Sequence, residues 1–239
     1  PYTTLFRSDP VTGSINYNRA GYPLAEIVTK PDFDSTDKVR EWLKELILIG
    51  SYIDAFYAIK SDVNVSIEES GYKRVEIKNV NSFTNIVAAA EAEVRRQREL
   101  VERGEGIKQE TRRYNEELDE TEFMRSKENA QDYMFIPEPD LPSLIVDEGV
   151  VEKLRGTIPE LPAQKRIKYS KFGLGGEDID VLVSNRYLTE VFEHALSEKL
   201  NPKEVGLFLR REIMRVLNYN KGTFEDLEKK DMKLEIAAL

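Results

Sequence analysis

Charged side chains stand inside three segments whose other residues have the pattern of β-strands. Glu26 lies in LAEIV, Asp62 lies in IKSDVNVS, and Glu76 and Lys78 lie in RVEIKN. Carboxylates are poor strand formers, and burying one without a partner costs several kcal/mol. On neighbouring antiparallel strands these carboxylates would converge on one sheet face. Oxygen ligands in that arrangement suit Mg²⁺, which takes one or two carboxylates together with substrate phosphates.

Basic residues accompany these carboxylates. Lys60, Lys78, Arg125 and Lys127 are available to neutralise phosphate charge, which is the main electrostatic requirement of phosphoryl transfer. The sequence contains no glycine-rich phosphate loop, so any ATP site must be made by a sheet face. The competing interpretation is that all these charges occupy the solvent face of a half-exposed sheet.

Composition narrows the classes of chemistry. The 239 residues include no cysteine and a single histidine, His194, which argues against disulfides, thiolate catalysis and histidine-rich metal sites. The chain carries 44 acidic and 35 basic residues, a net charge of −9, so a bound RNA would need a local basic patch. No run approaches the roughly 20 apolar residues that span a bilayer, and no signal peptide is visible. We therefore expect a soluble, cytoplasmic protein that makes no contact with a membrane.

The elements that must position these residues fall into two regions, which together predict an α+β fold. The first has two expected hairpins, one joined through Glu69–Gly71, and two long helices, one beginning after Ser35 and the other capped by Ser82 and ending at Gly104. Its expected strands cover 24–29, 57–67, 73–80, 107–114 and 121–127. The second region, from about residue 150, is helical, with helices expected near 163–172, 177–183, 185–199 and 202–219. Residues 1–8, PYTTLFRS, look like a translated sequencing adapter and are set aside as an artefact, and we expect the chain to be cut at both ends.

Several long segments resemble one known family in the order in which that family carries them. They are INYNRAGYPLAEIVTKPD, VEIKNVNSF, QETRRYNEELDETEFMRSKENAQDYMFIPEPDLPSL and IPELPAQKRIKYSKFGLGGEDIDVLVSN. Together they resemble the B subunit of aspartyl/glutamyl-tRNA amidotransferases over nearly everything after residue 13. A collinear series of this kind is far more specific than any single motif.

The resemblance implies a fold and an activity. Residues 9–149 would be the second half of a glutamine-synthetase-like antiparallel cradle domain, and 150–239 the start of a small all-α helical domain. The family is a carbon–nitrogen ligase with glutamine as the amide donor. With ATP and Mg²⁺ it converts the side-chain carboxylate of Glu-tRNA(Gln) or Asp-tRNA(Asn) into an acyl phosphate, which ammonia then turns into the amide. A glutaminase-type A subunit supplies the ammonia, a small C subunit completes the complex, and this fragment alone is expected to be inactive.

The resemblance also implies roles for the charged residues. Asp62 is the first metal-ligand candidate and Glu26 the second. Lys78 would bind phosphate or carboxylate, with Glu76 orienting it. The weaker candidates are Arg125 and Lys127 for catalysis and Lys60 and Asn64 for cofactor binding.

Some positions depart from the family pattern, and these keep alternatives open. Asn16 replaces the usual aspartate, Met134 stands where arginine is usual, and SYIDAFYAIKSDVNV is shorter than the family's acid-rich segment. One alternative is the archaeal E-type paralogue, which serves the glutamine tRNA alone. The other is a non-catalytic module that binds tRNA or partner proteins.

Overall fold

The computed structural model describes residues 7–8, 12–16, 25–55, 60–80, 82–126, 142 and 145–222. The chain forms two compact units, Pro1–Ser35 and Thr36–Leu239. In the first unit β1 (Arg7–Ser8) pairs antiparallel with β2 (Ile15–Asn16). The strand expected over 24–29 is wrong, because residues 25–30 are exposed and adopt no strand. Residues such as Ile27 and Val28 favour a strand, but a strand also needs a partner for its backbone hydrogen bonds.

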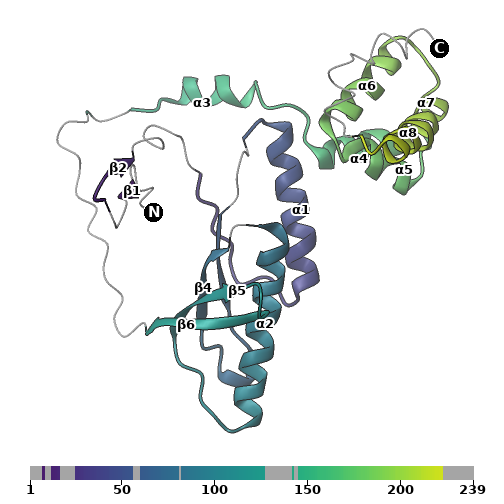
Figure 1. The fold of residues 1–239 in the computed structure, drawn as a ribbon. Coiled ribbons are helices and arrows are strands. Elements are labelled where there is room, and N and C mark those ends of the chain that lie inside the picture. The colour runs from purple at the N-terminus through teal and green to yellow at the C-terminus, as the bar shows by residue number, and fades with distance from the viewer. Residues whose placement is uncertain are drawn as a thin grey trace. The chain divides into compact units, whose positions relative to one another are not determined.

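The second unit contains a four-stranded sheet in the order β3-β4-β5-β6 (Figure 1). Its strands are β3 (Ser61–Val65), β4 (Val75–Val80), β5 (Glu110–Asn115) and β6 (Glu120–Ser126). The antiparallel pairs β3–β4 and β5–β6 confirm both predicted hairpins. Between β3 and β4 a 3₁₀ turn, Glu68–Ser70, is followed by Gly71 in the left-handed region at φ 67°, which glycine adopts without steric cost.

The two central strands run parallel, so the expected fully antiparallel sheet is wrong at this pair. Glu76 lies opposite Thr111, and Lys78 lies opposite Arg113. The physical reason is the connection, because α2 (Phe83–Glu102) lies between β4 and β5 and carries the chain back to the end where β4 began. The sheet is therefore mixed, and this pairing decides which side chains of β4 and β5 are neighbours.

Two helices pack on one face of the sheet. Ser82 caps α2, with its side chain accepting a hydrogen bond from the Asn85 N–H at 3.1 Å, and the helix ends before Gly104. The other helix, α1 (Thr36–Tyr52), contacts α2 and extends beyond Leu48, near which the sequence predicts its end. The buried core between helices and sheet consists of Leu43, Val65, Ile77, Val80, Ile86, Ala89 and Ala90. Because side chains alternate along a strand, the polar neighbours of Val65 and Ile77 lie on the opposite face.

The remainder of the described chain is helical, as expected. Its α-helices are α3 (Glu148–Arg155), α4 (Pro162–Ser170), α5 (Gly176–Val183), α6 (Arg186–Ser197), α7 (Pro202–Phe208) and α8 (Met214–Asn220). The single helix expected over 202–219 is interrupted by a π-helical segment, Leu209–Ile213, whose two end residues are both buried. Asn201 caps α7 as its position before Pro202 predicts.

This helical part has its own core, formed around Tyr169, Leu182, Leu188, Phe192 and Leu209. The rings of Tyr169 and Phe192 meet edge to face with centroids 4.8 Å apart. Tyr52, the last residue of α1, belongs to the same core. Among the helices that the structure describes, none is both long enough and apolar enough to cross a membrane.

Candidate functional site

The sheet face away from α1 and α2 collects most of the residues that sequence analysis selected. We call it the polar face, and its members are Asp62, Asn64, Glu76, Lys78, Thr111, Arg113, Glu122 and Arg125. Strand register places them together. Asn64, Glu76, Thr111 and Arg125 occupy paired positions across all four strands, and the next row contains Lys78, Arg113 and Glu122. Directly paired residues project from the same face of a sheet, so these side chains are neighbours.

Lys78 is held between two carboxylates. Its Nζ donates to Asp62 Oδ2 at 2.7 Å and lies 3.0 Å from Glu76 Oε1. The three side chains range from mostly buried to half exposed, with 14% of Glu76, 29% of Lys78 and 41% of Asp62 accessible. Asp62 reaches Lys78 because the β3–β4 register shifts between Ser61 and Val63, which is a bulge.

This arrangement keeps Lys78 charged. Partial burial alone lowers the pKa of an ammonium group, but the hydrogen bonds to Asp62 and Glu76 outweigh it and raise the pKa of Lys78 above its ordinary 10.5. Glu76 is oriented in turn by Thr111, a fully buried residue whose Oγ1 lies 3.4 Å from Glu76 Oε2. Glu76, the residue expected to orient Lys78, is in contact with it.

The other predicted site residues are placed less centrally. Asn64 lies exposed on β3 opposite Glu76, and Arg125 lies exposed on the edge strand β6 opposite Thr111. Lys60 is exposed and directly precedes β3. Glu26 lies in the separate N-terminal unit, on the exposed stretch 25–30. Lys127 lies outside the described residues.

A second cation on the polar face was missed by sequence analysis. Nε and Nη2 of Arg113 both contact Glu122 Oε2 at 2.7 Å. Glu122 also accepts from Asn115 Nδ2 at 2.7 Å. The hydrogen bonds from Asn115 and from Arg113 lower the pKa of Glu122, so its carboxylate stays ionised. The alternation of Thr111, Arg113 and Asn115 along ETRRYN was a usable signal.

A buried polar network on α2 was missed as well. Glu93 is fully buried and binds Arg96 at 2.7 Å, Thr121 Oγ1 at 2.6 Å and Gln97 at 2.8 Å. Arg112 of β5 adds an ion pair at 3.6 Å. The spacing of these residues along α2, i, i+3 and i+4, puts three polar side chains on a helix face that the surrounding alanines would suggest is apolar. These contacts join α2 to β5 and β6, so the role of the network is to hold the sheet in position against the helix.

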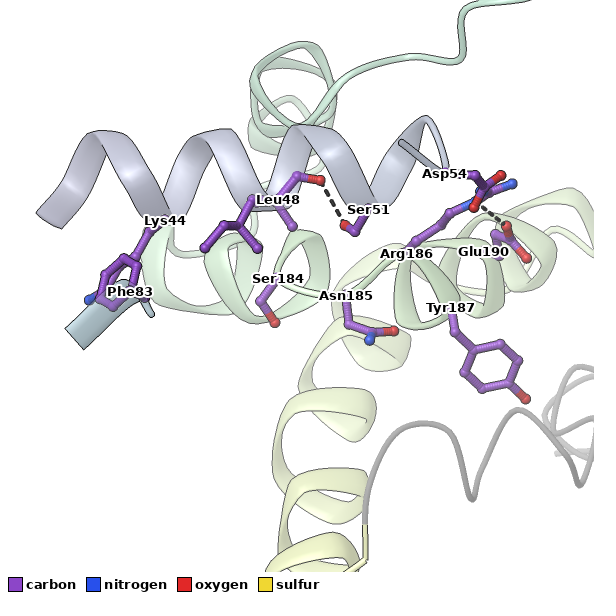
Figure 2. Close-up of a pocket in the computed structure, with 11 residues that line it drawn as sticks. Lys44, Leu48, Ser51, Asp54, Phe83, Ser184, Asn185, Arg186, Tyr187 and Glu190 are labelled. Atoms are coloured by element: carbon purple, nitrogen blue, oxygen red, sulfur yellow. Dashed lines mark hydrogen bonds and ion pairs between the residues drawn. The ribbon is translucent and has the colours of Figure 1, made fainter. Parts of the chain in front are cut away.

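A separate hollow of about 950 Å³ opens beside α1 and the start of α6 (Figure 2). Its lining includes Lys44, Leu48, Phe83, Asn185 and Arg186. Arg186 forms ion pairs there with Asp54 at 2.7 Å and with Glu190 at 3.1 Å. None of the residues selected for chemistry lines this hollow, so the polar face remains the candidate site.

The carboxylates of the polar face are its candidate metal ligands. Among the residues that the structure describes, no group of three or more His, Cys, Asp or Glu side chains is arranged to hold an ion. Magnesium needs only one or two protein carboxylates, because water and phosphate oxygens complete its shell. Asp62, whose side chain is 41% accessible, therefore remains a candidate ligand.

Comparison with known proteins gives a consistent set of relatives. The family described as "GatB/GatE catalytic domain" matches residues 4–152. Proteins named as the B subunit of aspartyl/glutamyl-tRNA(Asn/Gln) amidotransferase are similar over most of the chain. The one from Methanothermobacter thermautotrophicus is 42% identical over 221 residues, which is 91% of this chain and 49% of that protein. The one from Rickettsia felis is 42% identical over 225 residues, 90% of this chain and 46% of that protein. The chain thus spans about half the length of the curated relatives it matches.

Proposed function

Because the chain belongs to the GatB/GatE catalytic-domain family, we propose that it carries part of the ATP-dependent site of a tRNA amidotransferase. The observation that carries this proposal is Lys78, held between Asp62 and Glu76 on the polar face. The relatives are named for an aspartyl/glutamyl-tRNA(Asn/Gln) amidotransferase, and that name supplies the substrate class, a tRNA charged with aspartate or glutamate. The assembly would include a glutaminase-type A subunit and a small C subunit.

The proposed reaction has two steps. First, an oxygen of the amino acid's side-chain carboxylate attacks the γ-phosphorus of ATP, so an O–P bond forms, ADP leaves and an acyl phosphate remains. Second, ammonia attacks the acyl carbon, inorganic phosphate leaves with the bonding electron pair, and the nitrogen loses a proton to give the amide. Activation is needed because a carboxylate is a poor electrophile.

Lys78 has the properties that the first step requires. Its ammonium group is charged and is held in place by Asp62 and Glu76, so it is already oriented before phosphate arrives. A preorganised cation stabilises the charge that gathers on the transferred phosphoryl oxygens without needing to reorganise. Thr111 and Glu76 position Lys78. Asn64, which is paired with Glu76, is proposed to contact the nucleotide, and Arg125, which is paired with Thr111, is proposed to assist catalysis. Lys60 is proposed to bind the nucleotide on the strength of the family resemblance alone.

Asp62 is the proposed metal ligand in the described part of the sheet. Magnesium held by Asp62 would supply positive charge that offsets the charge of the ATP phosphates. Lys78 donates a hydrogen bond to Oδ2 of the same carboxylate and so holds it in place. Glu26 is proposed as a second ligand on the strength of the family resemblance alone.

The test uses the full-length protein assembled with its partner subunits. Asp62→Ala and Lys78→Ala should each reduce ATP-dependent amide formation on a misacylated tRNA by at least about a hundredfold, the range expected when a preorganised electrostatic group is lost. Lys73→Ala is the matched control, since Lys73 is an exposed lysine that precedes β4 on the same hairpin. If both variants and the control retain wild-type amidation, the assignment of this site is wrong and a role in binding tRNA or partners becomes the better account. Amidation assays with Glu-tRNA(Gln) and with Asp-tRNA(Asn) as separate substrates would distinguish the B type from the E type, which serves the glutamine tRNA alone.

A further inference from the structure

Two cations lie side by side at the centre of the polar face. Lys78 of β4 and Arg113 of β5 are register partners on parallel strands, so their side chains project from the same face of neighbouring strands. Adjacent strands lie roughly 4.8 Å apart. Like charges so close repel one another unless each has an anion beside it, and on this face each does.

The two cations are held in the same way. Lys78 binds Glu76, which Thr111 contacts from β5. Arg113 binds Glu122 of β6, and Asn115 donates a hydrogen bond to the other oxygen of that carboxylate. Each cation is therefore held by a carboxylate, and each of these carboxylates is held by a neutral side chain. Such an arrangement holds both charges in defined positions before any ligand binds.

Arg113 keeps part of its guanidinium group available. Its two contacts with Glu122 go through Nε and Nη2 to a single carboxylate oxygen, and within the described residues Nη1 makes no hydrogen bond. The side chain is 65% exposed, whereas Glu122 is 31% exposed. A guanidinium presents paired donors that match phosphate oxygens, and here one edge is anchored while the other faces outward.

We propose that Arg113 is a second phosphate-binding residue that acts beside Lys78, and that Glu122 is the residue that positions it. The inference rests on the proposed function, because it assigns Arg113 to the same phosphoryl-transfer site. The ligand chemistry is a phosphate group, which either the nucleotide or the tRNA backbone can supply. Lys78 provides a compact charge and Arg113 a planar fork, so together they can bind two oxygens of one phosphate.

The experiment measures kinetics of the assembled full-length enzyme with Arg113→Gln, Arg113→Lys and Glu122→Gln. ATP is varied at saturating misacylated tRNA, and then tRNA at saturating ATP. Arg113→Gln should raise the KM for ATP by about tenfold if the phosphate belongs to the nucleotide, or the KM for tRNA by a similar factor if it belongs to the backbone. Arg113→Lys should recover part of the loss, and Glu122→Gln should show a smaller rise in the same KM.

Arg95→Gln is the matched control. Arg95 also forms an exposed ion pair, with Asp119 at 2.5 Å, but it lies on α2 and away from the polar face. If Arg113→Gln leaves both KM values equal to those of Arg95→Gln, the inference about Arg113 is overturned while the proposed function stands. If the wild-type assembly makes no amide in the presence of ATP, the proposed function fails and this inference fails with it. Equal melting temperatures for the Arg113 and Arg95 variants exclude a merely structural effect.

Discussion

The hydroxyl groups of Tyr52 and Thr189 lie 2.7 Å apart inside the helical core, although 137 residues separate them in sequence. Tyr52 ends α1, whose earlier residue Leu43 belongs to the core of the sheet. Tyr52 also lies 2.9 Å from the Val183 carbonyl, and Thr189 lies 2.8 Å from the Leu182 carbonyl. The two hydroxyl groups therefore take part in three short hydrogen bonds. Helix α1 contributes Leu43 to the core of the sheet and Tyr52 to the helical core.

Removing the Tyr52 hydroxyl should weaken this junction. Burial raises the pKa of Tyr52, so the hydroxyl keeps its proton at neutral pH and can donate. Tyr52→Phe would leave a buried carbonyl or hydroxyl without a partner, which costs about 1.5 kcal/mol of the free energy of unfolding. Urea denaturation followed by circular dichroism measures the loss. Tyr219→Phe, at an 86% exposed tyrosine, should change nothing, and equal losses in both variants would contradict the role of the buried contacts.

The buried carboxylate of Glu93 should contribute more than any surface acid. Glu93→Gln keeps the shape of the side chain but removes the charge that faces Arg96 and Arg112. Leaving these two partly buried arginines with less compensation beside a buried site should cost about 3 kcal/mol. The control is Glu99→Gln, because Glu99 lies on the same helix, is 61% exposed and approaches Arg103 only to 3.6 Å. Chemical denaturation of both variants makes the comparison, and a loss for Glu99→Gln that matches that for Glu93→Gln would show that burial does not matter here.

Local patterns predicted the elements of the sheet but not its central pairing. Alternation predicted the strand around Val63, the turn at Gly71 predicted the first hairpin, and the acidic turn between the last two strands predicted the second, because hairpins are decided by neighbouring residues. The parallel pairing of β4 with β5 depends on how a 20-residue helix returns the chain, and no local pattern records that. The expectation of an antiparallel sheet was wrong for this reason.

The same limit explains which site residues were found. Asp62, Glu76 and Lys78 belong to one hairpin, so alternation along two adjacent strands was enough to bring them together. Arg113 joins them only through the parallel register. Glu93 lies on the other side of the sheet, and its contacts depend on the packing of α2. The strand expected around Glu26 is wrong because strand-forming residues do not by themselves supply a pairing partner.

Gly206 should tolerate no side chain while Leu174 keeps its present position. A Cβ at Gly206 in α7 would lie 2.6 Å from Leu174 Cδ2 and 3.5 Å from Leu182 Cδ1, and both leucines are buried. Overpacking of this kind outweighs the helix propensity that alanine adds, so Gly206→Ala should lose about 1 kcal/mol of stability net. Gly176→Ala, with open space around the new Cβ, is the control. In a Leu174→Ala background the cost of Gly206→Ala should vanish, and if it persists, the clash is not the cause.

The ion cluster on α4 and α6 should make the helical part sensitive to acid. Glu193 accepts from Lys165 at 2.7 Å and from Lys168 at 3.0 Å. Burial raises the pKa of Glu193, but the two lysines outweigh it and hold that pKa below the ordinary 4.5. A carboxyl whose pKa is lower in the folded state stabilises the fold above its unfolded pKa, and the contribution disappears as pH falls through the folded value.

Glu193→Gln therefore should cost about 1 kcal/mol at pH 7, a modest loss because the carboxylate is partly exposed and screened by water. The difference between wild type and variant should shrink as pH falls below about 4.5 and disappear once pH has fallen through the lowered pKa of Glu193. Lys168 sets the upper boundary, since Glu160 and Glu193 raise its pKa above 10.5, so its contribution is full below 10.5 and is lost as pH rises through the raised value. Urea titrations between pH 3 and pH 9 provide the measurement, with Glu198→Gln as an exposed control. A difference that stays constant down to pH 3 would show that the charge of Glu193 is not what stabilises the helices.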